Sequence, residues 1–164
     1  MQMSDFYPDD DDQFGFPLPF GKFHRGKLIE MLIITEPVYI GWLLSVGVFP
    51  RYRAAEKHIR WCIKRFDEKP FVVRCQTKGC KHVATRCTLY PNSPFPRYWC
   101  DSCTIDSDAP VLMVATTYHD VLHFLDVWCH NNRQLGRVLL RRLATAKGMP
   151  NKLTEKAVDD WFHG

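Results

Sequence analysis

Two closely spaced pairs of cysteines constrain this chain of 164 residues more than any other feature. Cys75 and Cys80 enclose four residues, Cys100 and Cys103 enclose two, and nineteen residues separate the pairs. Two thiolate pairs on tight turns, joined by a β-hairpin, can meet as a tetrahedral four-cysteine site for one zinc ion. Because four sulfur ligands leave no position for a substrate, such an ion would be structural. The pattern predicts structural Zn²⁺ bound by Cys75, Cys80, Cys100 and Cys103.

The segment from residue 75 to residue 103 resembles the zinc ribbon, in which two knuckles at the base of a β-hairpin clamp a zinc ion. The first pair departs from the commoner spacing of two residues, so Cys87 or His82 can replace Cys80 as a ligand. The remaining cysteines, Cys62 and Cys129, lie on apolar faces of expected helices, where a small buried thiol is the default interpretation. An odd cysteine count without a secretory signal disfavours a disulfide framework and favours a reducing, cytoplasmic compartment (the host cytoplasm for a viral protein).

The pattern of apolar residues predicts an α+β protein in four parts. These are an acidic disordered tail (1–13), a hairpin-and-helix module (14–67), the zinc ribbon (71–104) and a helical C-terminal segment (110–164). Helices are expected over 37–47, 51–66, 117–131, 132–147 and 154–162, and short strands over 83–90 and 97–99. The apolar run 28–34 is too short to distinguish a strand from a helix. No apolar run is long enough for a membrane span.

A second resemblance lies in the N-terminal half. The run Pro19-Phe20-Gly21-Lys22-Phe23-His24-Arg25-Gly26-Lys27, followed by Glu36-Pro37-Val38-Tyr39-Ile40-Gly41-Trp42-Leu43-Leu44, is similar to a small bacterial and phage module. That module occurs at the C-terminus of exodeoxyribonuclease X-like proteins and in small stand-alone proteins. The similarity covers residues 19–44 and implies association with nucleic-acid enzymes, from a phage or mobile element. It implies no nuclease activity, because the catalytic acids of such exonucleases belong to a separate domain.

Positive charge is concentrated outside the first twelve residues. Five acids and no Lys or Arg stand in that tail, so the formal net charge of +4 becomes +9 for the rest of the chain. Three basic clusters suit contact with backbone phosphates of nucleic acid. They are the hairpin residues Lys22, Arg25 and Lys27, the helical stripe Arg53, Lys57, Arg60 and Lys64, and the row Arg133, Arg137 and Arg141. Residues 132–147 contain no acid, so the arginine row needs an anion from elsewhere.

The sequence therefore favours a non-enzymatic, zinc-ribbon accessory protein that binds nucleic acid. A protein–protein adaptor or inhibitor that holds an acidic host protein is the main alternative, since the same cations suit an acidic surface. A second alternative is an HNH-like metal-dependent nuclease, because His119 and His123 stand four residues apart and Cys129 is followed by His130. The Asp-His and second C-x₂-C elements of that fold are missing, so no catalytic residue is assigned.

Overall fold

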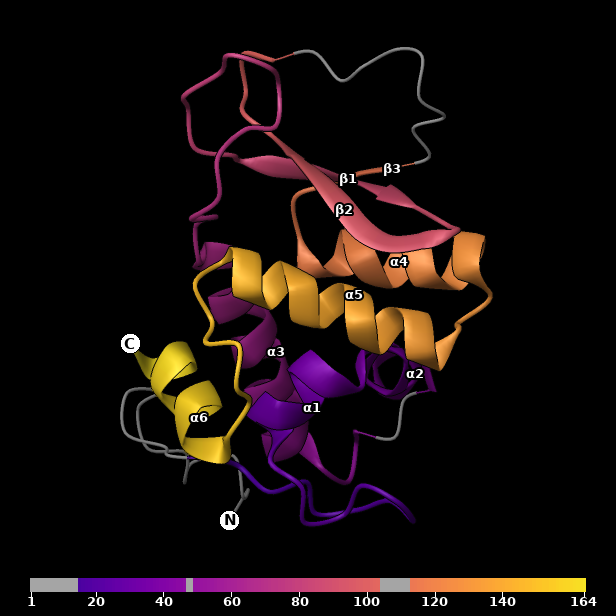
Figure 1. Cartoon of the computed structure of the whole chain (residues 1–164). Helices are drawn as coiled ribbons and strands as arrows, with labels where there is room; N and C mark the ends of the chain where they lie inside the picture. The colour runs from indigo at the N-terminus through magenta and orange to yellow at the C-terminus, as the bar shows by residue number, and fades with distance from the viewer. Residues whose placement is uncertain (1–14, 47–48, 104–112) are drawn as a thin grey trace.

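The computed structural model describes residues 15–46, 49–103 and 113–164 (Figure 1). Within these ranges the protein has six helices and a three-stranded antiparallel sheet, which confirms the predicted α+β class. The helices are α1 (Ile29–Thr35), α2 (Pro37–Val46), α3 (Arg53–Glu68), α4 (Tyr118–Cys129), α5 (Arg133–Ala146) and α6 (Glu155–His163). The predicted acidic tail and the predicted start of the C-terminal segment at residue 110 lie outside the described residues.

The helix boundaries follow local sequence signals. Pro37 occupies the first turn of α2, where its missing N–H removes no helical hydrogen bond. The side chains of Thr117, Asn132 and Thr154 accept hydrogen bonds at the N-termini of α4, α5 and α6. The ambiguous run 28–34 is largely helical, as α1, and it is apolar nearly all round because it lies in the centre of the core.

The sheet has the order β2-β1-β3, built from β1 (Arg86–Tyr90), β2 (Ser93–Trp99) and β3 (Met113–Ala115). Strand β2 pairs with β1 as a hairpin in which Arg86 opposes Trp99, and it is longer than the predicted stretch 97–99. Strand β3 has three residues, too few for a periodic pattern, and the sequence did not predict it. The sheet lies along α5 and α4 (Figure 1).

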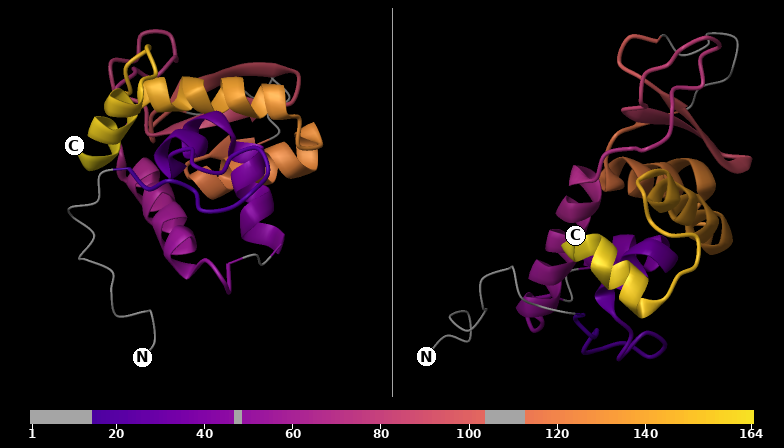
Figure 2. Two further views of the ribbon diagram at one scale, coloured as in Figure 1. Left: turned by 90° about the horizontal axis from the view of Figure 1, so that it is seen from below. Right: turned by 60° about the vertical axis from the view of Figure 1, so that its left-hand side comes forward.

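One hydrophobic core joins the two helical parts of the chain. Tyr118 of α4 is fully buried in it, packs edge-to-face against Phe66 of α3, and donates a hydrogen bond from its hydroxyl to the Ile33 carbonyl at 2.8 Å. Helix α1 packs against α3, α5 and α6. A second, small cluster of Cys75, Trp99 and Cys100 lies apart, where the cysteine-bearing loops project from one end of the helical body (Figure 2).

Among the described residues no single helix has the length and apolar character needed to cross a membrane. Helices α1 and α2 reach that length and composition only as a pair bent by 112°.

Lys147, at the end of α5, is a buried cation that connects several elements. Its ammonium group donates hydrogen bonds to the carbonyls of Phe66 at 3.1 Å and Lys69 at 2.9 Å, which caps the C-terminus of α3. It also lies 4.9 Å from the ring centroids of Phe66 and Phe71. Burial lowers the pKa of Lys147, and the nearby carboxylate of Asp67 opposes this shift. The sequence pattern gave no sign of this role.

Replacing Lys147 tests whether the buried cation stabilises the fold. Lys147→Met keeps the apolar stem but leaves the Lys69 carbonyl without its donor and the Phe66 carbonyl with only the Lys69 amide at 3.3 Å, so we expect the free energy of unfolding to fall by about 2 kcal/mol. Lys152→Met, at an exposed lysine, is the matched control and should change stability by less than about 0.5 kcal/mol. Urea unfolding measures both. A variant at 147 as stable as the wild type would mean that the cost of burying the charge cancels its hydrogen bonds.

Candidate metal centre

The first cysteine pair lies on a compact turn that precedes β1. The Cys75 amide donates to the His82 carbonyl at 2.9 Å, and the Cys80 amide donates to the Thr77 carbonyl at 3.0 Å. Gly79 adopts a φ of +81°, a conformation that residues with a Cβ rarely adopt. The backbone therefore folds back on itself between the two thiols.

The second pair follows directly from the end of β2. The Arg86 guanidinium donates to the carbonyls of Cys100, Asp101 and Cys103 at 3.3, 3.3 and 3.1 Å, which fixes the turn between these cysteines. The two loops are joined through Gln76, whose amide donates to the Tyr98 carbonyl at 2.9 Å. The hairpin thus brings together thiols that lie far apart in the sequence.

The sulfur atoms of Cys75, Cys80, Cys100 and Cys103 all lie within 4.8 Å of one another. The Cys80 and Cys100 sulfurs are 3.8 Å apart, close to the spacing of about 3.8 Å that tetrahedral coordination with metal–sulfur bonds of ~2.3 Å requires. All seven cysteines are free thiols, so no disulfide competes for these sulfurs. The four cysteines can hold one metal ion, as the sequence predicted.

Hydrogen bonding shifts the pKa values of two of these thiols in opposite directions. Burial raises the pKa of Cys75, but hydrogen bonds to the Thr77 hydroxyl and to backbone amides outweigh it and lower that pKa to about 6. The Thr77 hydroxyl also acts to lower the pKa of Cys103, but the thiols of Cys100 and Cys75 outweigh it and raise that pKa to about 12. A metal ion would replace all these protons, because thiolates are the form that binds metal.

The two alternative ligands lie outside the cluster. Cys87 is buried in β1, and its sulfur is 3.6 Å from the Ala115 carbonyl. Burial raises the pKa of the Cys87 thiol to about 12, as expected for an apolar setting. His82 is exposed, with Nδ1 3.5 Å from the Cys80 sulfur, and does not join the four-residue group. The longer spacing of the first pair is thus accommodated by the turn at Gly79.

The predicted arginine row on α5 meets an anion inside the protein. Arg133 pairs with a Glu36 carboxylate oxygen at 3.1 Å, and Arg137 pairs with the other oxygen of the same carboxylate. Arg137 also donates to the Thr35 carbonyl at 3.2 Å, and Arg141 donates to the Asn151 carbonyl at 2.8 Å. These three guanidinium groups therefore connect α5 to its neighbours.

The other predicted basic residues lie on the surface. On α3, Arg60 pairs with Glu56 at 2.9 Å and Lys64 lies 3.8 Å from Glu68, whereas Arg53 and Lys57 are exposed nearer the start of the helix. Lys22, Arg25 and Lys27 are exposed on the N-terminal hairpin.

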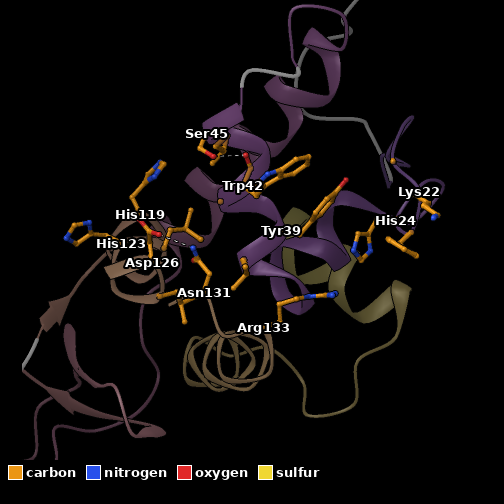
Figure 3. A pocket seen from close by; sticks show the side chains of 17 residues that line it. Lys22, His24, Tyr39, Trp42, Ser45, His119, His123, Asp126, Asn131 and Arg133 are labelled. Carbon is orange, nitrogen blue, oxygen red and sulfur yellow. Dashed lines mark hydrogen bonds between the residues drawn. The ribbon is translucent and has the colours of Figure 1, made fainter. Parts of the chain in front are cut away.

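That hairpin forms one wall of a groove of about 840 Å³ whose other walls are α2 and α4 (Figure 3). Tyr39 stacks between His24 and Trp42, at ring-centroid distances of 4.4 and 5.9 Å. His119 and His123 of α4 also line the groove. Neither histidine belongs to a three-residue metal-binding group in the described part of the chain, so the geometry does not bring a nuclease-type metal site together there.

Two sets of residues were missed from the sequence. Exposed cations on the cysteine lobe, Lys78, Lys81 and Arg97, were passed over because they do not form a helical stripe. Two partly buried groups that share Glu30, one with His58 and Cys62 and one with Asp159 and His163, were also missed, although the members of each pair stand four residues apart. A spacing of four residues places two side chains on one helix face, and this was the signal in the sequence for these residues.

Comparison of the chain with protein-family models, with curated proteins and with solved structures found no match in any of the three.

Removing one thiol tests the metal centre. Cys100→Ser should lower the metal content by one ion per chain, and the free energy of unfolding should fall with it, because metal binding and folding of this lobe are coupled. Cys129→Ser, at a buried thiol outside the cluster, is the control and should retain all bound metal. Elemental analysis of the purified proteins gives the result. Unchanged metal content in Cys100→Ser would refute the centre.

The Glu36 carboxylate predicts a pH effect. Hydrogen bonds and charge from Arg133 and Arg137 outweigh the opposing effect of burial and lower the pKa of Glu36 below its ordinary value. Its stabilising effect is present above the unfolded-state pKa and is lost as pH falls through the folded-state pKa. Glu36→Gln should therefore cost about 1 kcal/mol at neutral pH, and the difference from wild type should shrink below about pH 4.

Urea unfolding across this pH range measures the effect. Glu68→Gln, in an exposed ion pair on α3, serves as the control and should be nearly neutral at every pH. A cost for Glu36→Gln that stays constant down to low pH would contradict the assignment of the carboxylate as the anion of the arginine row.

Proposed function

We propose that this is a zinc-containing, non-enzymatic protein that binds nucleic acid through its cysteine lobe. The observation that carries the proposal is the charge of that lobe. Residues 71–103 contain five Lys and Arg side chains and one acid, Asp101. The cations are Arg74, Lys78, Lys81, Arg86 and Arg97.

The proposal of zinc rests on the donor set. Four thiols with sulfurs at tetrahedral spacing suit a soft or borderline divalent ion, and zinc is the usual occupant of such sites. The small cluster of Cys75, Trp99 and Cys100 buries too little apolar surface to order these loops alone. The ion would therefore supply the folding energy of the lobe and carry out no chemistry.

Part of the positive charge of the helical body is neutralised within the protein. Arg133, Arg137 and Arg60 are paired with glutamates. Lys78, Lys81 and Arg97 are exposed and form no ion pair with an acid in the residues that the structure describes. Cations that lack an internal partner are available to phosphates, whose neutralisation releases counterions and supplies affinity.

An exposed aromatic side chain lies on the same strand as Arg97, the edge strand β2. Phe95 of β2 is 56% exposed, and the Arg142 guanidinium lies 3.9 Å from the centre of its ring. Arg97 stands two residues further along β2 and is exposed on the same face. Exposed aromatic rings among cations can stack on unpaired bases, so single-stranded nucleic acid is the favoured ligand.

Salt-dependent binding tests this function. The zinc-loaded protein should bind short single strands of unrelated sequence, with affinity that falls linearly as log salt concentration rises. Lys78→Ala/Lys81→Ala should weaken binding and reduce the slope by about 1.4, because each lost phosphate contact on a single strand removes about 0.7. Fluorescence anisotropy between about 50 and 200 mM salt provides both quantities.

The matched control removes the same charge elsewhere. Lys152→Ala/Lys156→Ala, before and within α6, should leave the slope unchanged, and both double variants should retain their metal. Equal loss of affinity in the two double variants would mean that net charge alone attracts the strand. Failure to bind any nucleic acid at low salt would overturn the proposal and leave the adaptor for an acidic protein partner as the next hypothesis.

A further inference from the structure

Five side chains with metal-binding atoms gather inside the helical body, away from the cysteine lobe. Glu30 comes from α1, His58 and Cys62 from α3, and Asp159 and His163 from α6. The ligand atoms of Glu30, His58 and Cys62 lie within 4.8 Å of one another, and so do those of Glu30, Asp159 and His163. We propose that this cluster is a second, buried binding site for a divalent transition-metal ion.

Helical spacing produces this cluster. His58 and Cys62 stand one turn apart on α3, and Asp159 and His163 stand one turn apart on α6, so each pair shares a helix face. Two ligands four residues apart on a helix are a common way of presenting donors to one ion. Helix α1 packs against both α3 and α6, which places Glu30 with both pairs.

The burial of these groups distinguishes them from surface charges. Glu30 and Cys62 are fully buried and His58 is 4% exposed. Glu30 accepts a hydrogen bond from His58 Nε2 at 2.7 Å, and its second oxygen accepts from the Phe16 amide at 3.2 Å. Buried charges are rare unless they are paired or bind metal, so this arrangement needs a structural or functional reason.

A Glu30–His58 ion pair and an Asp159–His163 ion pair account for four of the five residues and leave Cys62. Within the described residues the Cys62 thiol forms no hydrogen bond, although it is fully buried and lies beside the Glu30–His58 pair. Asp159 lies 3.4 Å from His163 Nε2, and both side chains are about 15% exposed. A metal ion held by Glu30, His58 and Cys62 gives the thiol a partner, and the carboxylate–imidazole pair from α6 groups with the same Glu30 carboxylate.

The imidazole rings are held in position by aromatic neighbours. His58 stacks between Phe16 and Trp61, at centroid distances of 5.1 and 5.3 Å. The ring of His163 also packs against Trp61, at a centroid distance of 4.9 Å. Fixed ring planes lower the entropy lost on coordination, so the site is largely preorganised.

The donor set identifies the class of ion. Imidazole nitrogen, thiolate sulfur and carboxylate oxygen together suit zinc or another late first-row divalent ion. Magnesium and calcium do not fit, because they take oxygen ligands. Glu30, His58 and Cys62 supply three ligands, and Asp159 and His163, which group with the same Glu30 carboxylate, stand next to them. On binding, the Cys62 sulfur–hydrogen bond and the His58 Nε2–hydrogen bond are replaced by bonds to the metal. The thiol proton is released to solvent, and the neutral imidazole carries its one proton on Nδ1.

Metal stoichiometry tests the site. The 164-residue chain, produced with added zinc, should carry two ions by elemental analysis, with any partly filled site completed by calorimetric titration with Zn²⁺. Cys62→Ala should lose one ion, and Cys100→Ser should lose the other. Cys129→Ala is the matched control, at a buried thiol outside both groups, and should keep two.

A variant nearer the surface keeps the test decisive if Cys62→Ala fails to fold. His163→Gln, in the last turn of the chain's final helix, should weaken binding of the second ion by about tenfold or more while circular dichroism and the first ion stay unchanged. His123→Gln on α4 is its control. One ion per chain by both measurements, or a second ion insensitive to His163→Gln, would overturn the second site without affecting the proposed function of the cysteine lobe.

Discussion

The buried ammonium group of Lys147 connects the helical body to the cysteine lobe. It caps the carbonyl end of α3 although Lys147 stands at the end of α5. The backbone carbonyl of Lys147 in turn accepts a hydrogen bond from the Trp161 indole of α6 at 3.2 Å. The neighbouring Ala146 carbonyl accepts the Val72 amide at 2.8 Å, where the chain leaves the body toward the first cysteine. The direction in which the lobe projects therefore depends on where this cation is held.

Ion pairs inside the protein also change how the basic clusters of the sequence are interpreted. An acid-free row of arginines on one helix suggests an external polyanion. In the structure, however, the carboxylate of Glu36, between α1 and α2, forms ion pairs with two of the three arginines. Linear sequence shows where charges stand but not which distant acid folds onto them. The lobe is basic for a simpler reason, since it contains only one acid. Its charge survives folding because too few carboxylates are near enough to neutralise it.

The sequence predicted what local signals encode. Capping residues and apolar periodicity located the helices, and the spacing of Cys75, Cys80, Cys100 and Cys103 identified the sulfur cluster. It did not predict β3, which exists through pairing with β1, or the helical state of the short run at α1, which depends on burial by α3, α5 and α6. The Glu30 cluster needs three helices from both ends of the chain, so the sequence did not predict it, and Cys62 was interpreted as an ordinary buried thiol.

The two clusters place their donors in different physical settings. Around Cys75 and Cys100 the apolar cluster is small, so an ion there would be needed for the loops to fold at all. Around Glu30 the main core already fixes three helices, and the donors are ordered by packing and stacked rings before any ion arrives. A site of the first kind loses its structure with its metal. A site of the second kind can release and rebind an ion while the fold persists, so its occupancy can follow metal supply without being a condition of folding.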